Sequence, residues 1–204
     1  MEQLGDAAHA VQAPGPAREL IAAQPSREPV LELDGYAWRR ALPEDAATLD
    51  QLAAHGSNRV LFNLPSSADE FTARVGGAGL RLPMLCAYEG EFIGAGAFAA
   101  RSNRDLNAIL VSFFVEPSTA TQALAMYVRH LFWSWPFHRL YAQLPLVDGG
   151  AGYLALLTAI GFVEEGVVPE HALIAGRPCD VAVLGILRRE VEAWCQANES
   201  RLAL

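Results

Sequence analysis

The 204-residue chain contains no lysine, because arginine supplies all 15 of its basic residues. These arginines do not cluster beyond the pairs Arg39–Arg40 and Arg188–Arg189, and the net charge is −8. General nucleic-acid binding rests on neutralising phosphates with a basic surface. The sequence therefore argues against that function class, although it leaves room for a local anion site. An acidic surface is compatible with a cationic amine as substrate.

Cysteine is scarce and long apolar runs are missing. Cys86, Cys179 and Cys195 are odd in number and have no metal-binding spacing, which predicts reduced thiols and no metal site. No apolar run approaches the ~20 residues of a membrane helix. Residues 1–10 lack the basic and apolar regions of a signal peptide. We therefore expect a cytoplasmic protein that binds neither a metal nor a membrane.

Apolar residues make up 52% of the chain and charged residues 19%, which is enough for one domain with a sizeable core. Residues 1–30 are rich in proline and alanine, and they predict a flexible leader with a short helix over Ala17–Ala23. Residues 31–197 form the expected domain, and residues 198–204 a C-terminal tail.

Residues 106–135 read as one functional unit. A nearly unbroken apolar run predicts a strand buried on both faces, and Pro117 ends it. The helix that follows has good N-cap candidates and an apolar stripe. The caps are Ser118, Thr119 and Thr121, and the stripe is Leu124, Val128, Leu131 and Phe132. Unpaired N–H groups at such a helix start favour an anion, usually phosphate.

The remaining pattern alternates strands and helices. The small residues 94–97 predict close approach of another element to one strand of a hairpin centred on Glu89–Glu91. The class is therefore α+β, or α/β with a mixed sheet. The expected strands are 36–40, the two arms of that hairpin, 139–144, 162–168, 171–174 and 181–187. The expected helices are 43–56, 58–64, 68–76, 153–160 and 188–196.

The order of these elements resembles the GCN5-related N-acetyltransferase family, in its RimJ/RimL-like branch. The resemblance is carried by YEGEFIGAGAF, by VSFFVEPSTATQALAMYVRHLF and by AIGFVEEGVVPEHALIAGRPCDVAVLGILRREV. It implies a central, mostly antiparallel sheet of about seven strands flanked by helices, with the fourth and fifth strands splayed apart.

The resemblance also implies an acyltransferase that moves an acyl group from a thioester to an amine on a small molecule or peptide. Acetyl-CoA is the default donor, and another acyl-CoA is the variant. In relatives, backbone groups of the fourth strand bind the pantetheine, and amides at the next helix start hold the pyrophosphate. The matching positions here are Phe114, Val115, Glu116, Ala120, Thr121, Gln122, Ala123, Leu124 and Ala125.

The sequence departs from the family pattern at several of its working positions. The loop that usually reads Gln/Arg-x-x-Gly-x-Gly/Ala has Ala120, Ala123 and Ala125 in the same register. The resemblance places a frequent glutamate at Leu110, a proton-donating tyrosine at Leu157 and an asparagine at Gly150. The scaffold matches better than the catalytic side chains do.

Three side chains are candidates for catalysis, each with a structural alternative. Glu116 could accept a proton from the amine, or be a solvated strand end. Tyr153 could protonate the leaving thiolate, or be ordinary packing. His171 could act as a base, or be structural. Asn58, Phe62 and Asn63 could line the acceptor side, or simply pack. No Gly-x-Ser-x-Gly elbow is present to support a serine nucleophile.

Two other functions stay open. The altered loop would suit a donor without a diphosphate, such as a carrier-protein thioester or an aminoacyl-tRNA, although the acidic balance counts against tRNA. Alternatively, the chain is a non-catalytic binding module derived from the same fold. A homodimer could form through the leader and the closing strands.

Overall fold

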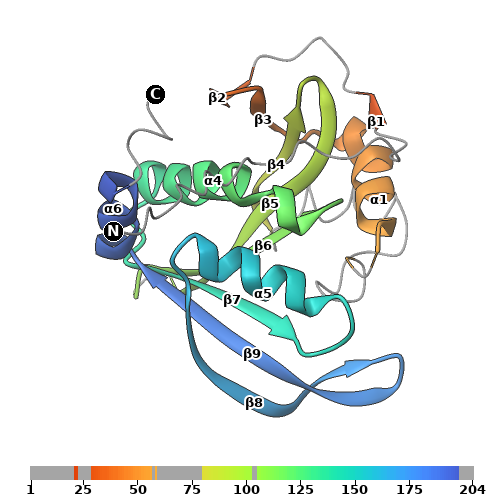
Figure 1. The fold of residues 1–204 in the computed structure, drawn as a ribbon, viewed down its shortest axis with the longest axis vertical. Coiled ribbons are helices and arrows are strands. Elements are labelled where there is room, and N and C mark those ends of the chain that lie inside the picture. Colours follow the sequence, from red (N-terminus) through yellow and green to blue (C-terminus); the bar gives the residue numbers. More distant parts are fainter. Residues whose placement is uncertain (1–20, 23–28, 57, 59–79, 103–104, 198–204) are drawn as a thin grey trace, which may run out of the picture.

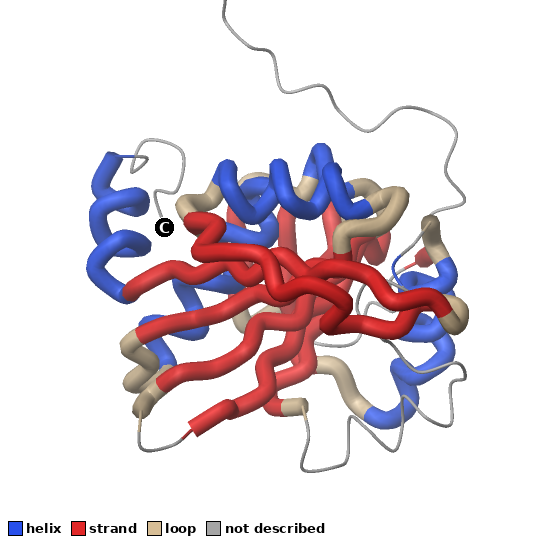
Figure 2. Tube along the Cα trace, turned by 90° about the horizontal axis from the view of Figure 1, so that it is seen from below, coloured by secondary structure: helices blue, strands red, loops and turns tan. Residues whose placement is uncertain are grey.

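The computed structural model describes residues 21–22, 29–56, 58, 80–102 and 105–197. Strands dominate it and form one twisted layer with helices on its outside (Figures 1 and 2). The strands are β1 (Ile21–Ala22), β2 (Leu31–Leu33), β3 (Tyr36–Arg40), β4 (Arg81–Tyr88), β5 (Glu91–Ser102), β6 (Asn107–Phe114), β7 (Arg139–Pro145), β8 (Val163–Ile174) and β9 (Arg177–Leu187).

The sheet runs in the order β2-β3-β4-β5-β6-β7-β9-β8, with β1 paired to β5 off this path. Every neighbouring pair is antiparallel except β6 and β7, which are parallel. The predicted mixed, mostly antiparallel sheet is confirmed. It has nine described strands, because β1 and β2 add two short ones.

Helices follow the strands in the predicted order. Those described are η1 (Pro43–Asp45), α1 (Ala46–Ala54), η2 (Pro117–Thr119), α4 (Thr121–Ser134), α5 (Gly150–Ala159) and α6 (Arg188–Ala197). No helix in these parts of the chain is long and apolar enough to cross a bilayer. Within the same residues, no group of His, Cys, Asp or Glu side chains is arranged to hold a metal ion.

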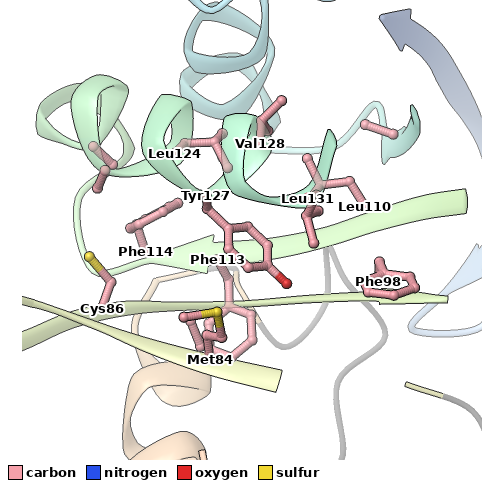
Figure 3. Packing of buried hydrophobic residues seen from close by; sticks show 14 of the residues in the cluster. Met84, Cys86, Phe98, Leu110, Phe113, Phe114, Leu124, Tyr127, Val128 and Leu131 are labelled. Atoms are coloured by element: carbon pink, nitrogen blue, oxygen red, sulfur yellow. The ribbon is translucent and has the colours of Figure 1, made fainter. Parts of the chain in front are cut away.

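The core lies between α4 and the strands that it crosses (Figure 3). Trp38 of β3 stacks on Tyr127 of α4, with ring centroids 4.7 Å apart, and donates from Nε1 to the Ala123 carbonyl at 2.9 Å. The small residues of β5 leave the space that this packing needs. A methyl group on Gly96 would lie 2.6 Å from the Tyr127 ring, and one on Gly94 would lie 2.7 Å from the Phe113 carbonyl. The predicted close approach is confirmed.

Several sequence expectations need correction. Ile21 and Ala22 pair with β5, so the helix expected over Ala17–Ala23 does not form at these two residues. The strand β6 is fully buried on one face only. The expected helices at 58–64 and 68–76 lie outside the described residues apart from Asn58. Residues Val163–Ile174 form one long strand, β8, where two segments, 162–168 and 171–174, were expected.

The start of α4 is also capped differently from the prediction. Its N-cap is Ala120, and no side chain caps the helix. Ser118 and Thr119 turn away, because each donates its hydroxyl to Glu116: Ser118 to the carboxylate at 2.9 Å and Thr119 to the carbonyl at 3.2 Å. The first-turn amides of α4 therefore have no side-chain partner.

Candidate active site

A wedge opens between the parallel strands β6 and β7. Their pairing covers only Asn107–Ile109 against Arg139–Tyr141. Beyond this point β6 stays paired to β5 as far as Phe114, and β7 stays paired to β9 as far as Pro145. The two strands therefore diverge while each remains held on its other side. The edge groups of β6 that face the wedge need other partners.

A small cavity occupies the wedge beneath α5. Its volume is about 10 Å³, roughly the space of one water molecule. Its lining is mainly apolar, and it includes both leucines that stand where the resemblance places acidic and tyrosine side chains. The lining residues are Leu110, Ser112, Ala142, Gln143, Leu144, Tyr153 and Leu157.

Tyr153 fills the deeper part of the wedge and binds the backbone of Phe114. Val115 N–H donates to Ile93 O of β5 at 2.8 Å. Because backbone groups alternate in direction along a strand, Phe114 faces the wedge instead. Its N–H donates to the Tyr153 hydroxyl at 2.7 Å, and its carbonyl lies 2.9 Å from the same hydroxyl.

Asn58 completes this network. Its amide donates to the carbonyls of Phe114 at 2.9 Å and Leu52 at 3.2 Å, and its Oδ1 lies 2.5 Å from the Tyr153 hydroxyl. The single hydroxyl proton serves either Asn58 or the Phe114 carbonyl at one time. Asn58 and Tyr153 are each 3% exposed. We call Phe114, Tyr153 and Asn58 the Phe114 latch.

Burial keeps the Tyr153 hydroxyl protonated. Burial is the main cause of its raised pKa, and the negative charge of Glu116 adds to the effect. Hydrogen bonds from Phe114 and to Asn58 partly offset the shift. The result is a neutral phenol, held as a proton donor, at the backbone position where the resemblance expects the thioester.

The structure brings two of the three catalytic candidates together. Glu116 is half-buried at the end of β6, and its charge acts on Tyr153. His171 is exposed on β8, which is separated from β7 by β9. Neighbouring strands lie about 5 Å apart, so β8 lies about 10 Å from β7 across the sheet. His171 therefore lies apart from the latch in the sheet.

The start of α4 was expected to hold a pyrophosphate. It offers backbone N–H groups for such a ligand, but acidic side chains lie around it. The 3₁₀ turn η2 uses the N–H groups of Thr119 and Ala120, and the first intrahelical bond of α4 comes from Leu124. Among the described residues the amides of residues 121–123 have no partner, which leaves them for a ligand. Ala120, Ala123, Leu124 and Ala125 are buried, whereas Thr121 and Gln122 are half-exposed.

Carboxylates surround this end of the sheet. The Gln122 side chain donates to Asp34 at 3.0 Å, and Tyr36 of the same hairpin bonds to the Thr119 carbonyl at 3.4 Å. No basic residue occurs in four segments of the sequence at this end of the sheet. They are the hairpin segments 31–36 and 88–92 and the segments 116–125 and 146–152. Backbone amides thus fit a diphosphate, while the side-chain charges around them oppose it.

The mouth of the wedge is narrow because η2 packs against the start of α5. A methyl group on Gly152 of α5 would lie 3.7 Å from the Pro117 side chain. A ligand arm entering here must move the latch, since the cavity behind it holds little more than a water.

The sequence pointed to Tyr153 and to Phe114 but not to their contact. Asn58 was expected at most to line the acceptor side, and its bond to the latch joins positions 95 residues apart. Phe62 and Asn63 lie outside the described residues.

The structure is similar to several solved acetyltransferases. One is Mycobacterium smegmatis RimJ in complex with a CoA disulfide, at 19% identity and a TM-score of 0.64, covering 81% of this chain and 90% of that one. Another is a GCN5-related N-acetyltransferase from Brucella melitensis, at 16% identity and a TM-score of 0.67, covering 89% and 88%. A spermidine N-acetyltransferase chimera from Vibrio cholerae and hSSAT matches at 18% identity and a TM-score of 0.65, covering 78% and 99%.

No protein-family model matches the chain, and no curated protein is significantly similar to it. At identities below 20%, the structural matches establish the fold. The fold expected from the sequence resemblance is thereby confirmed.

Proposed function

We propose that this chain, which has the fold of the GCN5-related N-acetyltransferases, is an N-acyltransferase that moves an acyl group from a thioester to an amine. The observation that carries the proposal is the Tyr153 hydroxyl on the Phe114 N–H inside the wedge. One backbone donor and one neutral phenol meet there. These are the two groups that a thioester needs, one for its carbonyl and one for its leaving sulfur.

The reaction follows from these positions. The donor arm enters the wedge and displaces the Tyr153 hydroxyl, so that the Phe114 N–H donates to the thioester carbonyl oxygen. The amine attacks the carbonyl carbon, the new C–N bond forms and the C–S bond breaks. Tyr153 gives its proton to the departing thiolate. Holding donor and acceptor together supplies most of the rate, because the reaction becomes effectively unimolecular.

The proton lost by the amine needs an acceptor, and our candidate is Glu116, whose charge acts on Tyr153. Its carboxylate stands at the end of β6 and is held by the Ser118 hydroxyl. Water reaching the half-buried Glu116 can relay the proton. His171 is left with a weaker role, at the acceptor side, since it is exposed on β8.

The donor and acceptor follow the charges of the site. The first-turn amides of α4 support acetyl-CoA or another acyl-CoA as donor, while the surrounding carboxylates favour a thioester without a diphosphate. The same carboxylates favour a cationic acceptor, which is a peptide amino terminus or a small polyamine. A homodimer remains a prediction that sedimentation can measure.

Calorimetry and a thiol-release assay test the proposal. Acetyl-CoA, acetyl-pantetheine and CoA are titrated first, and the two thioesters are then assayed for thiol release with spermidine or a short peptide. Amine-dependent thiol release supports the function. Preference for acetyl-pantetheine over acetyl-CoA identifies the donor without a diphosphate. If a folded protein releases no thiol from either donor with any amine, the proposal is wrong.

A non-catalytic binding module is the second candidate. The specific observation in its favour is the closed latch, which leaves only about 10 Å³ of free space in the wedge. This candidate predicts that neither pantetheine nor CoA binds, while the chain still unfolds cooperatively. The calorimetric titration therefore separates the two functions before any assay.

A further inference from the structure

A second hollow lies at the other end of α4 and is unrelated to the wedge. Its volume is about 520 Å³, which is within the usual range of small-molecule sites, about 300–1,000 Å³. Two arginines line it, and none of the described residues that line it is acidic. The lining residues are Arg40, Ala41, Leu42, Pro43, Leu80, Arg81, Leu82, Pro83 and Trp135. None of these residues belongs to the latch.

A bulge in β4 places the two arginines on one face of the sheet. Arg81 pairs with Phe98 and Met84 with Gly96, so three steps along β4 match two steps along β5. One extra residue in a strand reverses which face the following side chains occupy. Without it, Arg81 would lie on the face opposite Met84.

The bulge therefore turns Arg81 toward α4, because its pairing partner Phe98 contacts Trp135 just beyond that helix, with ring centroids 5.1 Å apart. Arg40 has the same orientation. It pairs with Met84 and follows Trp38 by two positions, and Trp38 stacks on α4.

The backbone of the bulge is held in place. Leu82 has a φ of 48°, which is unfavourable for a branched side chain. Its carbonyl accepts from the Tyr127 hydroxyl at 3.1 Å, and the neighbouring Pro83 carbonyl accepts from Ala41 N–H at 2.9 Å. Figure 3 shows Tyr127 reaching from α4 toward the strands with this hydroxyl. A strained residue fixed by a buried tyrosine indicates a built feature.

The electrostatics of the hollow favour an anion. Among the described residues, no carboxylate forms an ion pair with Arg40 or Arg81. Arg40 also acts on His130 of α4, whose pKa is lowered first by burial and then by this positive charge. The nearest acidic neighbour in sequence is Glu44, beside Pro43. Within the part of the chain that the structure describes, the hollow is therefore locally basic in a protein of net charge −8.

Trp135 and Leu42 supply an apolar wall. Trp135 is half-buried and stacks on Phe137, with the ring planes 12° apart, so the orientation of its ring is fixed. Leu42 is 39% exposed. A rigid indole beside two guanidinium groups suits a ligand that carries an anionic group on a ring or chain.

We infer that the hollow between Arg40, Arg81 and Trp135 is a binding site for a small organic anion. Its phosphate or carboxylate contacts the two arginines, and its apolar body packs on Trp135. This site does not depend on the proposed acyl transfer, since it shares no residue with the latch.

Calorimetry with four probes tests the site: phenyl phosphate, inorganic phosphate, benzoate and benzylamine. Phenyl phosphate or benzoate should bind, and the tighter of the two identifies the anionic group. Inorganic phosphate should bind more weakly, and benzylamine not at all. If benzylamine binds as well as the anions, or if neither aromatic anion binds below about 10 mM, the inference fails.

Matched variants locate the binding. Arg81→Gln and Arg40→Gln should each weaken the aromatic anion about tenfold or more, as expected for a charged hydrogen bond. Arg177→Gln, at the exposed β8–β9 turn, should change nothing. Trp135→Leu should remove the preference for the aromatic probe over inorganic phosphate. Equal weakening by Arg177→Gln would show that the anion is bound by overall charge.

The His130 imidazole gives a second readout. It is measured on the wild-type chain, so it does not depend on the stability of any variant. An anion bound beside Arg40 should raise the pKa of His130 in the NMR titration of the wild-type chain. An unchanged His130 titration at saturating probe would place the ligand elsewhere and overturn the assignment.

Discussion

Replacing Tyr153 with phenylalanine removes one hydroxyl and keeps the ring that packs under α5. The Phe114 N–H then loses its acceptor, and Asn58 Oδ1 loses the closest donor recorded for it. Both groups are buried, so water cannot replace the hydroxyl without opening the site. A buried donor left unpaired costs about 1–3 kcal/mol. We expect Tyr153→Phe to lower the free energy of unfolding by about 2 kcal/mol.

For a chain of this length, about 2 kcal/mol corresponds to a fall in Tm of about 4–8 °C. Differential scanning calorimetry measures it directly. Tyr88→Phe is the matched control, because Tyr88 is half-exposed, its ring contacts Tyr36, and its hydroxyl forms no hydrogen bond with the described residues. Its Tm should stay within about 1 °C of the wild-type value.

The hydrogen-bonding explanation predicts coupling with Asn58. In a double-mutant cycle of Tyr153→Phe and Asn58→Ala, the combined loss should be smaller than the sum by about 0.5–3 kcal/mol. Additive losses, or a Tm for Tyr153→Phe equal to that of the Tyr88 control, would refute the latch. The same variant should lower the rate of acyl transfer about 100-fold or more, as loss of a general acid does.

Three further predictions concern the fold. Gly96→Ala places a methyl group against the Tyr127 ring and should cost about 1–3 kcal/mol in urea unfolding; an unchanged midpoint would contradict this packing. Asp45→Asn breaks the buried pair with Arg39, whose two bonds are each 2.8 Å, and should cost about 3–5 kcal/mol; a loss below about 1 kcal/mol would mean that the pair is solvated. The Cys86 thiol is fully buried and its pKa is raised by burial, so maleimide should label it only in urea; rapid labelling of Cys86 in the native chain, assigned by peptide mass mapping because Cys179 is only partly buried, would refute its burial.

The sequence predicted well those helices, strands and turns whose structure depends on residues close together in the chain. The strand 36–40 coincides with β3, and the hairpin turn at Glu89–Gly90 has the positive φ angles, 50° and 86°, that its sequence favours. The buried stripe of α4 also follows the expected spacing. The helix α5 begins three residues earlier than expected, at Gly150.

Long-range contacts could not be predicted in the same way. The latch joins Asn58, Phe114 and Tyr153, which lie far apart in the sequence, and only the fold brings them together. The bulge at Leu82 was not predicted, although Pro83 inside the central strand β4 is a residue typical of bulges. Its strained φ is stabilised by Tyr127, 45 positions away.

The wedge also explains why the latch exists. Two strands that diverge leave backbone groups of β6 facing a space, and buried groups of this kind must be paired. In the structure, Tyr153 and Asn58 pair them; in an acyltransferase, the donor arm would have to take over this pairing. If the latch is worth about 2 kcal/mol, opening it weakens donor binding about 30-fold. Tyr153→Phe should therefore bind the thioester more tightly while transferring the acyl group more slowly, a combination that simple damage to the site would not produce.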